Sequence, residues 1–302
     1  MRHLLGIDEL DTSGISEILD RAEYYSRALE GGKWDHNHLA NKIIFHLFFE
    51  PSTRTLTSFE VAAKRLGAKV VNWNPETSSL SKGENFTDTI DTLSAMFPDA
   101  IVMRHGDYGA PKFVAARSNC PVINGGDSWR EHPTQALLDA MTMKQQFGRL
   151  EGLNVTIVGD ISHSRVASSN MQLLCKMGAN VRVVAPAVLM PEKLPFESIE
   201  AHDNLIDGIS GADVVMTLRL QKERMDSALI SSDAAYYNEF GLKVELLDKH
   251  AKGAMVMDPG PLVRGVQMED SLAEDMSRSL ILKQVANGIP TRMAVLDLVL
   301  GG

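Results

Sequence analysis

The residues most suited to chemistry are basic side chains that follow short apolar runs of the chain. They are Arg54, Arg104, Arg165 and Arg219, together with His132 at the start of a helical pattern. In open α/β sheets, ligands gather outside the carboxyl ends of the strands. Guanidinium groups are planar, permanently charged donors for phosphate and carboxylate oxygens. Their shared position therefore predicts a pocket for small anions, in a chain whose formal net charge is −9.

The segment Pro51-Ser52-Thr53-Arg54-Thr55 leads directly into a helical pattern. A helix start carries unpaired N–H donors and a partial positive charge. The hydroxyl groups add donors and Arg54 adds a fork suited to phosphate, so the segment predicts a phosphate cradle. An ordinary N-cap explains a Ser or Thr before a helix equally well, and this segment alone does not decide between the two.

A second polar group lies at His132-Pro133-Thr134-Gln135. A neutral imidazole at a helix start can donate to a carbonyl oxygen, and the helix dipole discourages its protonation. For an isolated His-Pro pair, a histidine that only caps its own helix is the simpler explanation. Arg104 and Arg219, each taken singly, are explained by pairing with a nearby acid. The hypothesis of function depends on all of them meeting at one edge of a sheet.

The polar segment from Ser78 to Glu84 contains three serines, Lys82 and Gly83, and precedes another helical pattern. It is either a lid that brings Lys82 to an anion or a solvated loop. From the residues alone, the solvated loop is favoured.

Several catalytic motifs are missing from the sequence. The apolar run Asn154–Val158 is followed by Gly159-Asp160 and not by GxGxxG, which argues against dinucleotide binding. The sequence has no GxxxxGK[ST] for a P-loop and no GxSxG for a nucleophile elbow. Its nine histidines show no HExxH or similar spacing, so we expect neither a catalytic metal nor another cofactor.

The elements that must position these residues alternate between strands and helices. The runs that predict strands in the first half are Ile43–Phe49, Lys69–Trp73, Ala100–Met103 and Pro121–Ile123. Apolar residues at helical spacing predict three helices in the same half. The first contains Leu56, Phe59, Ala63 and Leu66 and ends at Gly67, and the second contains Phe86, Ile90, Leu93 and Phe97. The third begins at Pro133. The strand runs of the second half are Asn154–Val158, Val181–Val184, Val214–Leu218 and Ala254–Met257.

This alternation predicts the α/β class, with two open, mostly parallel α/β sheets joined by helices. We place the boundary near residues 133–151. The segment 280–300 predicts a long amphipathic C-terminal helix, which we expect to pack back on the first domain.

Length and composition agree with this organisation. The 302 residues correspond to about two domains of roughly 100–200 residues. An acidic chain repels a phosphate backbone, so nucleic acid is not an expected partner. Two cysteines cannot form a disulfide scaffold. The start of the chain is too acidic for a signal peptide and no apolar run is long enough to span a bilayer, so we expect a cytoplasmic protein without a membrane partner.

Three segments together resemble the transcarbamoylase family. They are Phe49-Glu50-Pro51-Ser52-Thr53-Arg54-Thr55, Ile101-Val102-Met103-Arg104-His105 and His132-Pro133-Thr134-Gln135. Within that family, the segment from Thr217 to Arg224 is similar to the catalytic chains that carbamoylate aspartate. Their lid loop resembles Ser78–Glu84 of this chain. Their late loop resembles Asp258-Pro259-Gly260-Pro261 with Arg264-Gly265. The resemblance runs from about Leu4 to Leu300.

The resemblance implies a role for each matching residue. Ser52, Thr53, Arg54, Thr55, Arg104, His132, Gln135, Pro259 and Gly260 would bind carbamoyl phosphate. Among them Arg54 would contact the phosphate, Thr55, Arg104 and His132 the carbonyl oxygen, and Gln135 the NH2 group. Arg165, Arg219 and Gln221, with Lys82, would hold L-aspartate. Arg54, Thr55, Lys82, Arg104 and His132 would be catalytic.

The resemblance also implies an assembly and a reaction. Ser78, for which Ser79 is an alternative, and Lys82 would reach the site from the neighbouring subunit of a homotrimer. Residues 1–133 with 286–302 would bind carbamoyl phosphate, 134–150 would be a linking helix, and 151–285 would bind aspartate. The carbamoyl group would pass to the aspartate amine, as in the committed step of pyrimidine synthesis. The resemblance admits regulatory or dihydroorotase-like partner chains.

One residue departs from the family pattern, and two other readings remain. The family usually has His-Pro where this chain has Asp258-Pro259, so a carboxylate lies beside the expected anion pocket. An ornithine carbamoyltransferase shares the first motifs but usually has a cysteine in this loop. A non-catalytic subunit that only binds anions is the third reading, and the full set of basic residues argues against it.

Overall fold

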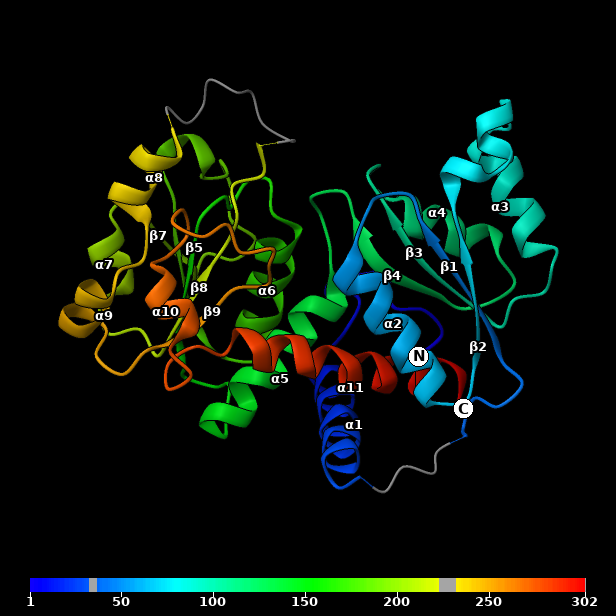
Figure 1. Ribbon diagram of the computed structural model, residues 1–302, viewed down its shortest axis with the longest axis horizontal. Coiled ribbons are helices and arrows are strands. Elements are labelled where there is room, and N and C mark those ends of the chain that lie inside the picture. Colours follow the sequence, from blue (N-terminus) through cyan, green and yellow to red (C-terminus); the bar gives the residue numbers. More distant parts are fainter. Residues whose placement is uncertain (33–36, 223–231, 302) are drawn as a thin grey trace. The chain divides into compact units, whose positions relative to one another are not determined.

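The computed structural model describes residues 1–32, 37–222 and 232–301. The chain forms two compact units (Figure 1): unit 1 is Met1–Met141 with Ala286–Gly302, and unit 2 is Thr142–Val285. Each unit contains one sheet in which every strand pair is parallel. The predicted α/β class with two open parallel sheets is therefore confirmed.

The sheet of unit 1 has the strand order β2-β1-β3-β4. Its strands are β1 (Ile43–Phe48), β2 (Lys69–Trp73), β3 (Ala100–His105) and β4 (Val122–Asp127). In register, Phe45 of β1 lies opposite Val71 of β2 and Ile101 of β3. Because the strands are parallel, the carboxyl ends of β1, β3 and β4 lie at one edge of the sheet. The loops that leave this edge carry most of the predicted site residues.

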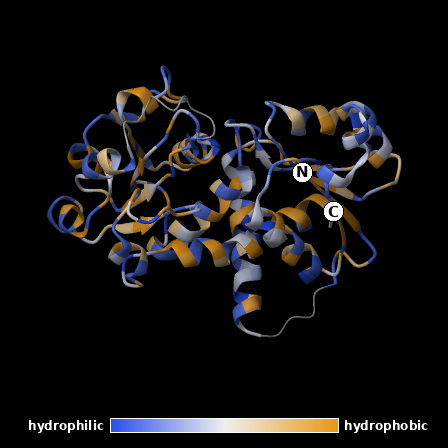
Figure 2. Cartoon of the chain, turned by 45° about the horizontal axis from the view of Figure 1, so that its top comes forward, coloured by the Kyte–Doolittle hydropathy of each residue, from blue (hydrophilic) through white to orange (hydrophobic). Residues whose placement is uncertain are grey.

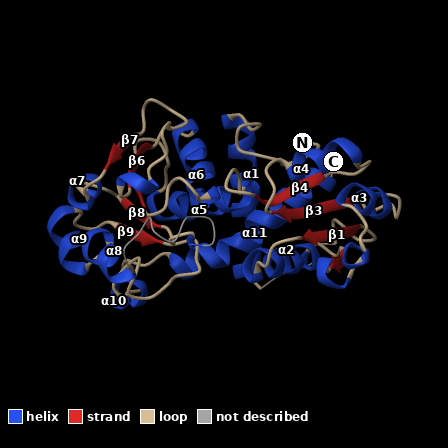
Figure 3. Cartoon of the chain, turned by 90° about the horizontal axis from the view of Figure 1, so that it is seen from above, coloured by secondary structure: helices blue, strands red, loops and turns tan. Residues whose placement is uncertain are grey.

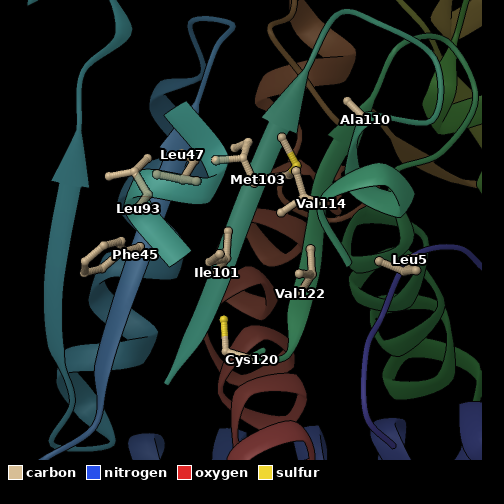
Figure 4. Packing of buried hydrophobic residues seen from close by; sticks show 11 residues of the cluster. Leu5, Phe45, Leu47, Leu93, Ile101, Met103, Ala110, Val114, Cys120 and Val122 are labelled. Atoms are coloured by element: carbon tan, nitrogen blue, oxygen red, sulfur yellow. The ribbon is translucent and has the colours of Figure 1, made fainter. Parts of the chain in front are cut away.

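Helices cover both faces of this sheet, as Figure 3 shows from above. Alternate residues of the central strands point to one face, where Phe45, Leu47, Ile101 and Met103 pack against Leu93 of α3 (Phe86–Ser94) and Val114 of α4 (Ala110–Arg117). Figure 4 shows this cluster. The opposite face carries His46, whose ring lies 6.2 Å from that of Phe59 on α2 (Thr53–Arg65). Burial on both faces accounts for the nearly continuous apolar strand runs.

The remaining elements of unit 1 come from distant parts of the chain. They are α1 (Thr12–Glu30), the short turns η1 (Pro75–Thr77) and η2 (Ser79–Lys82), and the parts of α5 (Pro133–Phe147) and α11 (Ile281–Leu300) that fall in this unit. Pro133 is the first residue of α5, as predicted. Residues of α11 from Ala286 onward belong to unit 1, so the C-terminal helix does return to the first unit. The helices carry both hydrophilic and hydrophobic residues along their length (Figure 2).

The sheet of unit 2 has the order β7-β6-β5-β8-β9. Its strands are β5 (Asn154–Val158), β6 (Asn180–Val184), β7 (Glu200–His202), β8 (Val214–Thr217) and β9 (Met255–Met257). The helical elements of its described residues are α6 (Arg165–Lys176), η3 (Ala187–Leu189), α7 (Leu205–Ile209), α8 (Asp233–Phe240), α9 (Val244–His250) and α10 (Asp270–Glu274). The carboxyl ends of β5, β8 and β9 share one edge.

The structure corrects some predicted details. Phe97, predicted to continue a helix, lies beyond the end of α3 and has φ +57°, because the chain turns before Pro98. The strand at 200–202 was not predicted, since Glu-Ala-His has no apolar pattern. Within the polar segment from Ser78 to Glu84, residues Ser79–Lys82 form a 3₁₀ turn, which the sequence did not predict. Among the described residues, no helix is both long and apolar enough to cross a bilayer.

Candidate active site

The start of α2 presents an uncapped helix end at the carboxyl edge of the unit 1 sheet. Ser52 precedes the helix with φ −159° and makes no side-chain capping hydrogen bond. An ordinary side-chain N-cap therefore does not account for this serine. Arg54 is exposed in the first turn, whereas Thr55 is buried. The arrangement leaves hydroxyl, backbone N–H and guanidinium donors at a helix N-terminus, which suits a phosphate group.

Thr55 meets His132 across the edge of the sheet. Thr55 Oγ1 lies 3.4 Å from His132 Nε2, although the two residues are 77 positions apart in the sequence. Both side chains are at most 5% exposed. His132 follows the turn after β4, in which Asp127 N donates to the carbonyl of Glu131. Two polar groups thus converge in a site with little water, where donors act strongly on a developing negative charge.

Arg104, at the end of β3, is anchored by two contacts. Its Nε lies 3.2 Å from Glu50 Oε2, and one terminal nitrogen donates to the carbonyl oxygen of Gly125 at 3.3 Å. Arg104 does pair with an acid, as the simpler reading expected. That pairing also holds the guanidinium at the sheet edge from which Thr55 and His132 project.

The ring of His105 packs against two aromatic rings near this edge of the sheet. Its ring centroid lies 4.7 Å from that of Phe49 and 5.0 Å from that of Phe86. The backbone N–H of Asp107 donates to His105 Nδ1 at 2.9 Å. Burial lowers the pKa of His105, so the imidazole is neutral and accepts this hydrogen bond.

Gln135, in the first turn of α5, is the fourth group at this edge. Its backbone N–H donates to the carbonyl oxygen of His132 at 3.0 Å. Its side-chain Nε2 donates to Asp139 Oδ1 at 2.9 Å. Asp139 is fully buried. The sequence had not indicated Asp139; a carboxylate one helical turn after Gln135 is the signal that could have identified it.

Ser78 and Lys82 lie after the edge strand β2, apart from the groups described above. The Ser78 hydroxyl donates to the carbonyl of Pro75 at 2.7 Å and accepts from the N–H of Leu80, so it caps η2. Lys82, like Ser79, is exposed. In the described chain, no contact joins Lys82 to Arg54, Thr55 or Arg104. A single chain therefore does not bring the predicted lid residues to the site.

In unit 2, Asp160 organises the loop after β5. This fully buried carboxylate accepts from the backbone N–H of His163 at 3.1 Å, and its Oδ1 lies 2.8 Å from His163 Nδ1. Arg165 begins α6 five residues later and is buried. Gly159, with φ +137°, allows the loop to pass close to the end of β8, since a Cβ there would lie 2.5 Å from the carbonyl oxygen of Leu218.

Arg219 and Gln221 form a paired unit after β8. One terminal nitrogen of Arg219 donates to Gln221 Oε1 at 3.0 Å, and the other to the carbonyl of Leu220 at 3.2 Å. The backbone N–H of Gln221 donates to Asp160 Oδ2 at 3.1 Å, which ties this loop to the one carrying Arg165. Sequence reasoning assigned Asp160 no role. Glu223 and Arg224, which belong to the same motif, lie outside the described residues.

Asp258, the departure from the family pattern, is buried and saturated with hydrogen bonds. Its Oδ2 accepts from Thr217 Oγ1 at 2.7 Å and from Gln267 Nε2 at 3.2 Å, and its Oδ1 accepts from Gly260 N at 2.7 Å. These donors hold the carboxylate and brace the loop that contains Pro259 and Gly260. Asp258 therefore ties the end of β8 to the end of β9.

Asp160 and Asp258 act on one common side chain. Burial raises the pKa of the Tyr236 hydroxyl, and the negative charges of Asp160 and Asp258 raise it further. Tyr236, on α8, is therefore close to both carboxylates and stays protonated. In the described part of the chain, no group of three or more His, Cys, Asp or Glu residues is placed to hold a metal ion.

Two sets of predicted residues are thus each gathered at one sheet edge. Unit 1 brings together Ser52, Thr53, Arg54, Thr55, Arg104, His132 and Gln135. Unit 2 brings together Arg165, Arg219, Gln221, Asp258, Pro259 and Gly260. The first set offers donors to a phosphate and a carbonyl oxygen, and the second offers guanidinium groups to carboxylates.

Two family profiles match the chain in succession. Residues 2–145 match the carbamoyl-P binding domain of aspartate/ornithine carbamoyltransferase, and residues 151–299 match its Asp/Orn binding domain. The aspartate carbamoyltransferase catalytic subunit of Jannaschia sp. (strain CCS1) is 50% identical over 298 residues, which cover 98% of this chain and 95% of that protein.

Solved structures agree with this match. The aspartate transcarbamoylase of Trypanosoma cruzi, in complex with carbamoyl aspartate and phosphate, is 31% identical, with a TM-score of 0.90 over 99% of this chain and 96% of that one. The ornithine carbamoyltransferase of Pyrococcus furiosus is 30% identical, with a TM-score of 0.91 over 100% of this chain and 97% of that one. Backbone similarity thus does not separate the two acceptor classes.

Proposed function

Because the chain belongs to the aspartate/ornithine carbamoyltransferase family, we propose that it transfers the carbamoyl group of carbamoyl phosphate to the α-amine of L-aspartate. The products are N-carbamoyl-L-aspartate and phosphate, and the reaction is the committed step of de novo pyrimidine synthesis. The new bond joins the amine nitrogen to the carbamoyl carbon, and the bond from that carbon to the phosphate oxygen breaks. The attacking amine loses one proton in this step.

The carbonyl oxygen is the point at which the unit 1 donors act. Negative charge grows on this oxygen as the amine attacks, and preorganised donors there lower the barrier. Thr55, Arg104 and His132 fill that role. The 3.4 Å approach of Thr55 Oγ1 to His132 Nε2 supports it, because one oxygen atom can be reached by both groups. Each such donor typically contributes about 2.7–4 kcal/mol to catalysis.

The phosphate and the NH2 group are held by the rest of the same edge. Ser52, Thr53 and Arg54 bind the phosphate at the start of α2 and stabilise it as it departs. The exposure of Arg54 and the absence of a Ser52 side-chain cap support this assignment, because both side chains remain available to a ligand. Gln135 holds the carbamoyl NH2 group. Pro259 and Gly260, which belong to unit 2, are assigned to carbamoyl phosphate by the family resemblance alone.

L-aspartate is bound by Arg165, Arg219 and Gln221. Its two carboxylates need two cationic partners, and bidentate guanidinium groups are the usual ones. The hydrogen bond from Gln221 N to Asp160 links the Arg219 loop to the Arg165 loop and supports their joint action. Asp258 does not oppose anion binding strongly, since both of its oxygens accept hydrogen bonds.

The complete site requires more than one chain. Ser78 and Lys82 act on the site of a neighbouring subunit in a homotrimer, which accounts for their separation from the site residues of their own chain. Residues 1–133 with 286–302 form the carbamoyl-phosphate domain, 134–150 the linking helix and 151–285 the aspartate domain. A cytoplasmic location and association with regulatory or dihydroorotase-like chains are further parts of the proposal. Size-exclusion chromatography with light scattering tests the trimer directly.

The observation that carries the choice of acceptor is the 50% identity to an aspartate carbamoyltransferase catalytic subunit over nearly the whole chain. The loop that follows β9 supports the same choice, because it lacks the cysteine that ornithine enzymes usually have in this loop. The pairing of Arg219 with Gln221 also suits an acidic acceptor better than a cationic one.

A colorimetric assay for ureido compounds tests the function. The purified chain is incubated with carbamoyl phosphate and either L-aspartate or L-ornithine, and the product is identified by mass spectrometry. We expect carbamoyl aspartate and little citrulline. Citrulline as the main product would replace the aspartate assignment by the ornithine one, and no product with either acceptor would support a non-catalytic subunit.

A further inference from the structure

Asp139 restricts how the side chain of Gln135 can lie. The two residues are one helical turn apart on α5, and Gln135 Nε2 donates to Asp139 Oδ1 at 2.9 Å. An ionised carboxylate only accepts hydrogen bonds, whereas the two ends of an amide differ: NH2 donates and the oxygen accepts. The NH2 end of Gln135 must therefore face Asp139. Its carbonyl oxygen is directed away from Asp139 as an acceptor.

Arg292 supplies a positive charge that acts on the buried Asp139 and favours its ionised form. It lies on α11, in the part of that helix that belongs to unit 1, and is itself buried. Burial lowers the pKa of this guanidinium to about 10, while the negative charge of Asp139 raises it, so Arg292 remains charged near neutral pH. A buried carboxylate that has neither a nearby cation nor enough hydrogen-bond donors tends to be protonated instead. A protonated Asp139 could donate to Gln135 and would no longer determine its orientation.

The packing around Arg292 is specific. Its guanidinium lies over the ring of Phe59 on α2, 5.0 Å from the centroid, and donates to the carbonyl of Gly288 at 3.2 Å. A Cβ at Gly288 would lie 2.7 Å from Arg292 Nη1, so a larger residue at this position would force the guanidinium to shift. Three helices thus contribute to this buried cluster: Phe59 lies on α2, Asp139 on α5 and Arg292 on α11.

We propose that Asp139 and Arg292 are positioning residues that fix the amide orientation of Gln135, so that the site selects an acyl phosphate bearing an NH2 group. The inference rests on the proposed function, since it assumes that Gln135 meets the carbamoyl group. A carbamoyl NH2 donates to the carbonyl oxygen of Gln135, the end of the amide that faces away from Asp139. The methyl group of acetyl phosphate has nearly the same shape and donates nothing. A site with a fixed acceptor discriminates between the two, because the methyl group leaves that acceptor unpaired.

The test compares the affinity of two donors in four chains. The dissociation constants of carbamoyl phosphate and acetyl phosphate are measured by titration calorimetry, without aspartate, for the wild type and for Asp139→Asn. The double variant Asp139→Asn/Arg292→Gln removes both buried charges and so avoids leaving one of them unpaired. The control Thr291→Val removes the hydrogen bond from Thr291 Oγ1 to Met141 Sδ, which joins the same two helices without touching Asp139.

The preference for carbamoyl phosphate is the dissociation constant of acetyl phosphate divided by that of carbamoyl phosphate. We expect this ratio to fall about tenfold in Asp139→Asn, because the amide of Gln135 can then turn its NH2 toward the substrate. The same fall is expected in the double variant, with thermal stability close to that of the wild type, and no fall is expected in Thr291→Val. If Asp139→Asn does not fold, the double variant decides the question.

Three results would overturn the inference: an unchanged preference in both Asp139 variants, a preference restored in the double variant, or an equal fall in Thr291→Val. The last two would show that a loosened helix pair, and not the orientation of Gln135, changed the selectivity. A wild-type chain that neither binds carbamoyl phosphate nor makes carbamoyl aspartate would instead remove the proposed function itself.

Discussion

His46 gives the fold of unit 1 a calculable dependence on pH. It lies on β1, fully buried, with its ring 6.2 Å from that of Phe48 and 6.2 Å from that of Phe59. His46 Nδ1 lies 3.0 Å from Asn72 Oδ1. Burial lowers the pKa of His46 from its ordinary 6.5 to about 4, although the Asn72 hydrogen bond and the charge of Glu60 raise it. The folded chain therefore holds a neutral imidazole.

The direction of this pH dependence follows from how many protons the folded and the unfolded chain bind at His46. Between pH 6.5 and 4 the unfolded chain binds a proton at His46 that the folded chain does not, so acid favours unfolding. Above the pKa of His46 in the unfolded chain, the neutral histidine makes its full contribution to the free energy of unfolding. That contribution is lost as the pH falls toward the pKa of His46 in the folded chain. With pKa values of 6.5 and about 4, linkage gives a loss of about 2 kcal/mol in the free energy of unfolding between pH 7 and pH 5.

The assay is urea unfolding, followed by circular dichroism at a fixed chain concentration at both pH values. Other groups titrate in this range, so the informative quantity is the difference between the wild type and His46→Leu. We expect the variant to lose about 2 kcal/mol less than the wild type on acidification. His250→Gln, at a half-buried histidine on α9, serves as the control for removing a histidine elsewhere in the chain.

A wild type and a His46→Leu variant that differ by less than about 0.5 kcal/mol in this loss would refute the reasoning. Such a result would mean that His46 finds a partner for its proton in the folded state or exchanges readily with water. Equal behaviour of His46→Leu and His250→Gln would lead to the same conclusion.

Three further predictions concern the site. Thr55→Val removes one carbonyl donor and should lower kcat about 10²–10³-fold, with little change in melting temperature because its 3.4 Å contact with His132 is long; a loss below tenfold in steady-state assays would contradict its role. Arg54→Ala should lower turnover by orders of magnitude while circular dichroism shows an intact fold, since the side chain is exposed; near-normal turnover would remove the phosphate assignment. Asp258→Ala leaves the donors of Gly260 and Gln267 without their acceptor and should reduce the free energy of unfolding by about 3 kcal/mol in urea titrations; an unchanged value would show that the loop is held by other contacts.

Much of the fold could be predicted from local patterns. The strands Lys69–Trp73 and Asn154–Val158 have the bounds that their apolar runs predicted. Gly67 follows α2 with φ +85°, as expected for a residue beyond a helix end. These features could be predicted because they depend on residues that are close together in the sequence. The spacing of the apolar residues indicates which face of a helix or strand is buried. The strand at 200–202 lacked such a pattern and could not be predicted.

The candidate site could be predicted as a set of residues but not as a set of contacts. Parallel strands place their carboxyl ends at one edge, so residues after β1, β3 and β4 had to share that edge. The sequence contained no information on which of them touch. The approach of Thr55 to His132 and the pairing of Arg104 with Glu50 join residues from different elements.

The sequence by itself determined the alternating elements, the shared edge of each sheet and the residue types available there, because these follow from local periodicity and chain direction. Only the tertiary structure decided how the buried charges are satisfied. Asp139 and Arg292 are separated by more than half of the chain, and Asp258 finds its donors on β8 and beyond β9. A buried carboxylate requires a partner, but any of the many donors in the sequence satisfies that requirement. The choice is made when the helices and strands pack.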